Sequence, residues 1–146
     1  MKKLVLLFVA IMVTVPVAAL GEQVADPAET VAAFHEALAS ENREQVLELL
    51  SPELVIFEDS GKEASRKEYA SHHLGSDMKF SAGAKRKILD QSVNVGKDTS
   101  WVMTRYTVKG KSGSKRIQLE SAETIVLEKT DNGWRIAHIH WSNKVL

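Results

Sequence analysis

The chain has 146 residues, of which 44% are hydrophobic and 26% are charged, a composition that fits one globular domain. Lysine plus arginine and aspartate plus glutamate both number 19, so there is no basic excess to attract nucleic acid and none is expected as a partner. These values exclude a multidomain protein and a polytopic membrane protein, and the absence of cysteine excludes a disulfide-stapled miniprotein.

The first 21 residues have the three-part pattern of a secretory signal peptide. Two lysines precede an apolar run over residues 4–15, which is followed by Pro16 and by small residues up to Gly21. A membrane anchor is the alternative, but the run is shorter than the roughly 20 apolar residues that a span needs. We therefore expect removal of residues 1–21, a single domain over residues 22–146, and a periplasmic or secreted protein without a stable membrane span.

The segment after the signal peptide predicts two helices. Asp26 can cap a helix whose first residue is Pro27, and apolar residues then recur at steps of three and four positions. His35 lies beside the apolar face of this helix. A second, shorter helix is expected over residues 43–50, because Pro52 prevents its continuation.

The rest of the chain predicts one short strand, one short helix and a meander of long strands. Residues 54–57 are the short strand, and a capping box at Ser65 predicts a helix that carries Tyr69, His72 and His73. The long strands are expected over residues 86–95, 100–109, 116–129 and 134–143. Helices followed by a strand meander predict an α+β domain.

The order of these elements resembles that of the SnoaL-like branch of the nuclear transport factor 2-like superfamily. The last hairpin of that branch is similar to residues 131–142, DNGWRIAHIHWS, which also resemble the end of the association domain of calcium/calmodulin-dependent kinase II. The resemblance covers about residues 26–143. It implies a cystatin-like cone of N-terminal helices packed on a strongly curved antiparallel sheet, with a pocket and often a homodimer through the sheet. The superfamily includes isomerases, cyclases, dehydratases and association modules, so the resemblance does not specify a reaction.

Histidines and aromatic residues are the candidates for lining that pocket. On the last predicted strand, alternation puts His138 and His140 on one face with Trp134 and Ile136, and we expect this face to line the pocket. The alternative is that both histidines are ordinary sheet residues, satisfied by neighbouring polar groups. The full set of ligand-pocket candidates is Phe57, Tyr69, His72, His73, Trp101, Met103, His138 and His140.

Three functions are open for such a pocket. The first is binding of a small organic molecule, with no cofactor and no established reaction. The second is an acid–base enzyme of the isomerase, dehydratase or cyclase type, because histidine transfers protons near neutral pH. Its candidate residues are His138 or His140, assisted by Glu58, Asp59, Tyr69 or Glu123. The third is a copper or zinc binder, with candidate ligands His72, His73, Asp77, Met78, His138 and His140.

Overall fold

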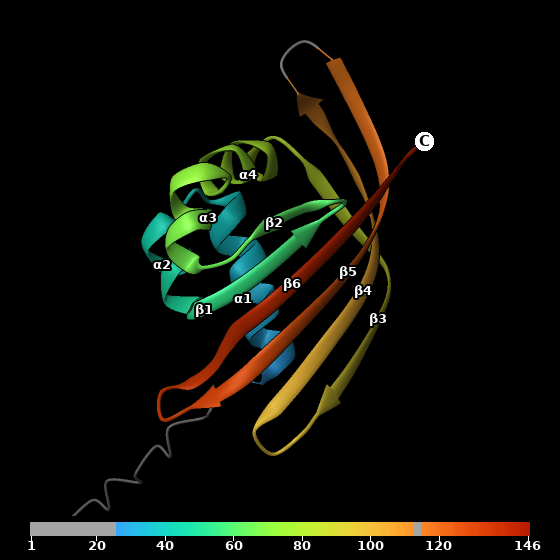
Figure 1. Ribbon diagram of the computed structural model, residues 1–146. Helices are drawn as coiled ribbons and strands as arrows, with labels where there is room; N and C mark the ends of the chain where they lie inside the picture. Colours follow the sequence, from blue (N-terminus) through green and yellow to red (C-terminus); the bar gives the residue numbers. More distant parts are fainter. Residues whose placement is uncertain (1–25, 113–114) are drawn as a thin grey trace, which may run out of the picture.

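The computed structural model describes residues 26–112 and 115–146 (Figure 1). The predicted signal peptide, residues 1–21, lies outside the described residues, so its cleavage and the export of the protein stay predictions. Within the described ranges, no helix is long and apolar enough to cross a membrane.

In the described part of the chain, four helices pack on one side of a six-stranded sheet, and the predicted α+β class is confirmed. The helices are α1 (Pro27–Ala39), α2 (Arg43–Leu49), α3 (Arg66–His72) and α4 (Leu74–Ala82). The strands are β1 (Leu50–Glu58), β2 (Gly61–Glu63), β3 (Lys85–Val95), β4 (Thr99–Ser112), β5 (Lys115–Thr130) and β6 (Gly133–Val145). The sheet is strongly curved, and the helices occupy its concave side (Figure 1). Helix α4 was not expected from the sequence.

Helix α1 begins where the sequence predicts. The Asp26 carboxylate accepts a hydrogen bond from the N–H of Ala28 at 2.8 Å, and the Glu29 carboxylate accepts one from the N–H of Asp26 at 3.2 Å. This reciprocal capping box satisfies backbone donors that a helix start leaves free. Because the first turn is held in this way, the register of α1 is defined, and Phe34 is fully buried beside a cavity-lining His35.

The sheet has the strand order β2-β1-β6-β5-β4-β3. Neighbouring strands are antiparallel except for β1 and β6, which are parallel. This pair corrects the expectation of a wholly antiparallel sheet. The two strands stand near opposite ends of the domain sequence, so no tight hairpin forces them to run in opposite directions.

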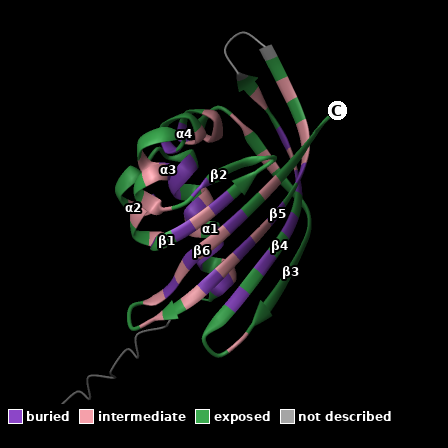
Figure 2. Cartoon of the chain, in the orientation of Figure 1, coloured by how far each residue is buried: buried purple, intermediate pink, exposed green. Residues whose placement is uncertain are grey.

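The apolar core lies between α1 and the concave face of the sheet. Burial alternates along the strands, as expected for a sheet with one covered face (Figure 2). Side chains of α1 meet the sheet at the inward positions Val102, Ile125, Leu127, Ile136 and Ile139. Toward the start of β5 the inward-facing residues become polar, at Glu123 and Ser121, although both residues are buried. The core therefore ends at a polar layer, and a cavity begins there.

A bulge in β6 changes which residues of that strand face inward. Ile136 pairs with Leu127 and His138 pairs with Val126, so Ala137 is an extra residue with no partner on β5. An extra residue reverses the alternation of side chains beyond it. Trp134 and Ile136 point inward before the bulge, and Ile139 and Trp141 point inward after it. The expectation that His138 and His140 share a face with Trp134 and Ile136 was wrong for this reason.

Candidate functional site

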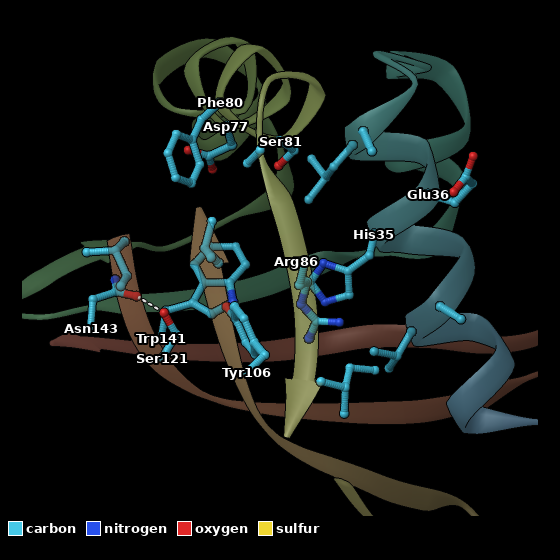
Figure 3. A pocket seen from close by; sticks show the side chains of 18 of the residues that line it. His35, Glu36, Asp77, Phe80, Ser81, Arg86, Tyr106, Ser121, Trp141 and Asn143 are labelled. Atoms are coloured by element: carbon cyan, nitrogen blue, oxygen red, sulfur yellow. Dashed lines mark hydrogen bonds between the residues drawn. The ribbon is translucent and has the colours of Figure 1, made fainter. Parts of the chain in front are cut away.

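A cavity of about 520 Å³ lies between α1, α4 and the strands of the curved sheet. Its apolar wall comes from α1 at Ala28, Val31 and Ala32 and from Phe80 and Ile88. Figure 3 shows Asp77, Phe80 and Ser81 of α4 on one side, with strand residues opposite them and His35 of α1 beside Arg86. The polar lining residues are His35, Glu36, Glu58, Asp77, Ser81, Arg86, Gln91, Tyr106, Ser121, Trp141 and Asn143.

A fully buried carboxylate, that of Glu123, organises one end of the cavity. Its Oε2 accepts a hydrogen bond from the indole N–H of Trp141 at 2.6 Å. Its Oε1 accepts from Arg86 Nη2 at 3.2 Å and lies 3.0 Å from His35 Nε2. Burial by itself raises the pKa of Glu123, but the hydrogen bond and charge of His35, together with Trp141 and Arg86, hold that pKa below its usual value. Glu123 is therefore a carboxylate at neutral pH.

The ionised Glu123 orients His35 and Arg86 at the cavity wall. A carboxylate can only accept a hydrogen bond, so His35 donates to Glu123 from a proton on Nε2. The Arg86 guanidinium lies 3.9 Å from the ring centroid of Tyr106, in a cation–π contact. Burial raises the pKa of Tyr106, so its phenol stays protonated and can donate a hydrogen bond. The wall thus offers the protonated phenol of Tyr106 as a hydrogen-bond donor, beside a histidine and an arginine that Glu123 holds in place.

A second acidic group, Asp77, faces the cavity from α4. It accepts a hydrogen bond from the hydroxyl of the buried Tyr69 at 2.8 Å. Burial raises the pKa of Asp77 to about 6, the hydrogen bond from Tyr69 opposes that rise, and the nearby charge of Glu58 adds to it. Asp77 also borders a smaller cavity of about 90 Å³ that is lined in part by Tyr69 and His73. A carboxyl group with this pKa can both accept and return a proton near neutral pH.

The structure places the sequence-predicted site residues in three locations. Tyr69 and His73 border the small cavity, and His72 is an exposed residue at the end of α3. The other five predicted residues lie on the outer face of the sheet. There the strand register aligns Met103, Thr124, His140 and Phe57 in one row across the strands, and it aligns Trp101, Val126 and His138 in the next row. The expected pocket face is therefore corrected for Phe57, Trp101, Met103, His138 and His140.

His138 matches the alternative of an ordinary sheet histidine. Its Nδ1 donates to the carbonyl oxygen of Val55 at 2.8 Å, and its ring packs edge-on against Phe57 with 5.7 Å between centroids. Met78 is in the hydrophobic core. Among the described residues, the group whose possible metal-ligand atoms lie within 4.8 Å of one another consists of Glu63, Glu68 and His72. The expected convergence of the helical and strand histidines on one ion is not seen there.

His35, Arg86 and Tyr106 were not among the residues predicted for the site, Glu123 was named only as a possible partner of a catalytic histidine, and Asp77 only as a possible metal ligand. A signal for Glu123 was present, because it occupies an inward position of a strand whose next inward residues are Ile125 and Leu127. A carboxylate in such a position must be buried and paired. Nothing in the sequence connected Glu123 with His35, because α1 and β5 meet only in the fold.

The chain is similar to known proteins in sequence and in fold. The family model of the SnoaL-like domain matches residues 28–145. The chain is 31% identical to a candidate ketosteroid isomerase from Shewanella frigidimarina NCIMB 400, over 77% of this chain and 91% of that chain, with a TM-score of 0.71. No curated protein matches this chain.

Two further solved structures have the same fold. A candidate calcium/calmodulin dependent protein kinase II association domain from Xanthomonas campestris is 24% identical, over 82% of this chain and 89% of that one, with a TM-score of 0.66. A nuclear transport factor 2-like superfamily protein from Salmonella enterica is 18% identical, over 78% and 85% of the two chains, with a TM-score of 0.67. At these identities the likeness shows the fold alone.

Proposed function

This chain belongs to the SnoaL-like domain family of the nuclear transport factor 2-like superfamily, and on that premise we propose that its cavity binds a small organic molecule. The observation that carries the proposal is the combination of a cavity of about 520 Å³ with an apolar wall and a few convergent polar groups. Ligand pockets commonly have volumes of about 300–1,000 Å³ and this kind of lining.

The charges around the cavity favour a ligand with an uncharged polar head. The cation of Arg86 is already paired with the carboxylate of Glu123, so little positive charge remains for an anionic ligand. Asp77 and Glu58 add negative charge at the opposite side. A carbonyl or hydroxyl group can accept a hydrogen bond from Tyr106 without meeting repulsion, and the hydrocarbon body of the ligand can pack on α1 and Phe80.

A pair of matched variants tests ligand binding. Ala32 lies on α1, is exposed and lines the cavity, so Ala32→Trp should fill part of the cavity without disturbing the core. Ala82 on α4 is also exposed but does not line it, and Ala82→Trp is the control. Compounds found to stabilise the wild-type protein in a thermal-shift screen should stabilise Ala82→Trp equally and Ala32→Trp much less. If no neutral compound of this size stabilises the wild type, or if both variants respond alike, the proposal fails.

A second candidate function is acid–base catalysis of the isomerase type, and the observation that favours it is Asp77. This carboxyl group has a pKa of about 6, borders the cavity and is fixed by Tyr69. The candidate ketosteroid isomerase among the similar structures points to the same class of reaction. Asp77 would take a proton from carbon next to a ligand carbonyl and return it, while the Tyr106 phenol donates a hydrogen bond to the carbonyl oxygen.

The catalytic proposal has its own readout. Wild-type protein in deuterated buffer should introduce deuterium next to the carbonyl of a bound cyclic ketone, and mass spectrometry measures the gain. Asp77→Asn should slow the exchange by at least about 100-fold, the usual scale of general-base catalysis, while ligand-induced stabilisation persists. His140→Ala, on the outer face, is the control and should exchange at the wild-type rate. If the wild type and Asp77→Asn exchanged at the same rate, the catalytic proposal would be refuted and the ligand-binding proposal would be unaffected.

We also propose a homodimer through the outer face of the sheet. The support is a set of large apolar side chains that stay solvent-exposed there, namely Phe57 at 41%, Trp101 at 39% and Met103 at 45%. The register brings them into two adjacent rows on one face of the sheet, and large apolar side chains gathered on an exposed face mark an interface. The similar association domain from Xanthomonas campestris is named for assembly.

Export remains a proposal that rests on residues 1–21 alone. Expression of the full chain in a Gram-negative bacterium should yield periplasmic protein whose mass corresponds to cleavage after Ala19 or Gly21. Recovery of the uncleaved chain from the cytoplasm or the membrane would contradict the proposal.

A further inference from the structure

A buried carboxylate outside the main cavity has an oxygen with no hydrogen-bond partner. Glu63, at the end of β2, has only 7% of its side chain exposed, and its Oε1 is held by His73 Nδ1. Its Oε2 is fully buried and accepts no hydrogen bond. Buried carboxylate oxygens are ordinarily satisfied, because removing them from water without a partner is costly. The orphaned atom therefore points to a group that completes this site.

Two side chains close to Glu63 carry potential metal-ligand atoms. Glu68 and His72 are four positions apart on α3, so their side chains lie on the same face of that helix. One ligand atom from each of Glu63, Glu68 and His72 lies within 4.8 Å of the other two. His72 Nδ1 is 3.4 Å from Glu63 Oε2. Two ligands of a tetrahedral zinc ion are about 3.3–3.4 Å apart when the bonds are about 2.0–2.1 Å long.

The backbone holds these three residues in place for reasons that are independent of any ion. Ser65 caps α3 by accepting the N–H of Glu68 at 3.1 Å, and Glu68 Oε2 accepts the N–H of Ala64 at 2.6 Å. The chain therefore passes directly from β2 into α3 with Glu68 facing back toward the strand. His73 hydrogen-bonds the other oxygen of Glu63 and so fixes the orientation of this carboxylate, as outer-shell partners do for the ligands of known metal sites.

We propose that Glu63, Glu68 and His72 bind a zinc-like divalent cation, with the fourth position open to solvent. Two carboxylates balance the charge of the ion, and an imidazole nitrogen favours zinc over calcium or magnesium. His72 has 58% of its side chain exposed, so an ion can reach the site without opening the core. The site lies between β2 and α3 and does not depend on what the main cavity binds.

The experiment uses untagged protein that has been stripped with EDTA. Titration with ZnCl2 by isothermal calorimetry should show one ion per chain, and Co²⁺ should give the visible absorption of a four-coordinate N/O site. His72→Ala removes an exposed ligand without affecting the core, and it should weaken binding by at least about 100-fold, since loss of mere supporting partners already costs about 10–100-fold. Glu63→Gln and Glu68→Gln should weaken binding as well.

His140→Ala provides the matched control, because it removes an exposed histidine from the outer face of the sheet. It should bind zinc as the wild type does. The proposal is overturned if the wild type shows no saturable binding, if His72→Ala binds as tightly as the wild type, or if His140→Ala loses the ion. Because His72 is exposed, its variant is expected to fold, so a loss of binding there reports the ligand and not the fold.

Discussion

Replacement of Glu123 by glutamine tests the central polar network of this protein. The variant keeps the size of the side chain but removes its charge, so Trp141, His35 and Arg86 lose a common ionised acceptor. Hydrogen bonds to a charged group contribute about 1.5–3 kcal/mol, and breaking a buried ion pair costs about 3–5 kcal/mol. His35 and Arg86 retain 19% and 23% of their side-chain exposure, which lowers the expected cost. We expect the free energy of unfolding to fall by about 2–4 kcal/mol.

Urea denaturation followed by circular dichroism measures this loss. With a slope of about 2 kcal/mol per molar urea, the midpoint should fall by about 1–2 M. Glu120→Gln is the control on the same strand, because its ion pair with Arg105 is at the surface and should contribute little. If Glu123→Gln changed the midpoint no more than Glu120→Gln does, the buried network would not stabilise the fold.

The pH dependence of stability gives a second check on Glu123. Its pKa in the folded protein lies below the ordinary value of 4.5, so the unfolded chain binds the proton more readily. The stabilisation by the carboxylate is therefore complete above about pH 4.5 and is lost as the pH falls through the lower folded-state pKa. The difference in stability between wild type and Glu123→Gln should shrink in that acidic range. A difference that stays constant down to acid unfolding would contradict the assigned ionisation.

Three further predictions concern the cavity and the outer face. Because the pKa of Asp77 is raised to about 6, ionisation of Asp77 should destabilise the fold as the pH rises from about 4 to 6. Asp77→Asn should therefore have a higher Tm than the wild type at pH 7.5 but not at pH 4, and equal Tm differences at both pH values would refute this. Tyr69→Phe removes the hydrogen bond that lowers the pKa of Asp77, so the carboxyl titration followed by NMR should move above pH 6, and an unchanged midpoint would show that the bond is unimportant. Trp101→Glu should convert the proposed dimer to monomer in light scattering, whereas Lys87→Glu on edge strand β3 should not; a wild type that is monomeric at every concentration would end the dimer proposal.

The local patterns of the sequence were sufficient for the fold class and for the order of the elements other than strand β2 and helix α4. Asp26, Pro27 and Glu29 specify a helix start through bonds within one turn, so the position of α1 could be read directly. The closing hairpin indicated the family, and the family implied the helices on a curved sheet. These features depend on interactions between residues that are close in the chain, and short sequence motifs reveal such interactions.

The identity of the cavity residues was decided by tertiary structure. One unpaired residue, Ala137, reverses which side chains of the rest of β6 point inward. No residue pattern within the strand predicts this bulge. That reversal puts His138 and His140 outside and brings the indole of Trp141 to Glu123. His35 reaches the same carboxylate from α1, far away in the sequence. The sequence by itself determined most of the segments that become helix or strand, since those preferences are local. Only the packing of helix on sheet could decide which side chains share a cavity.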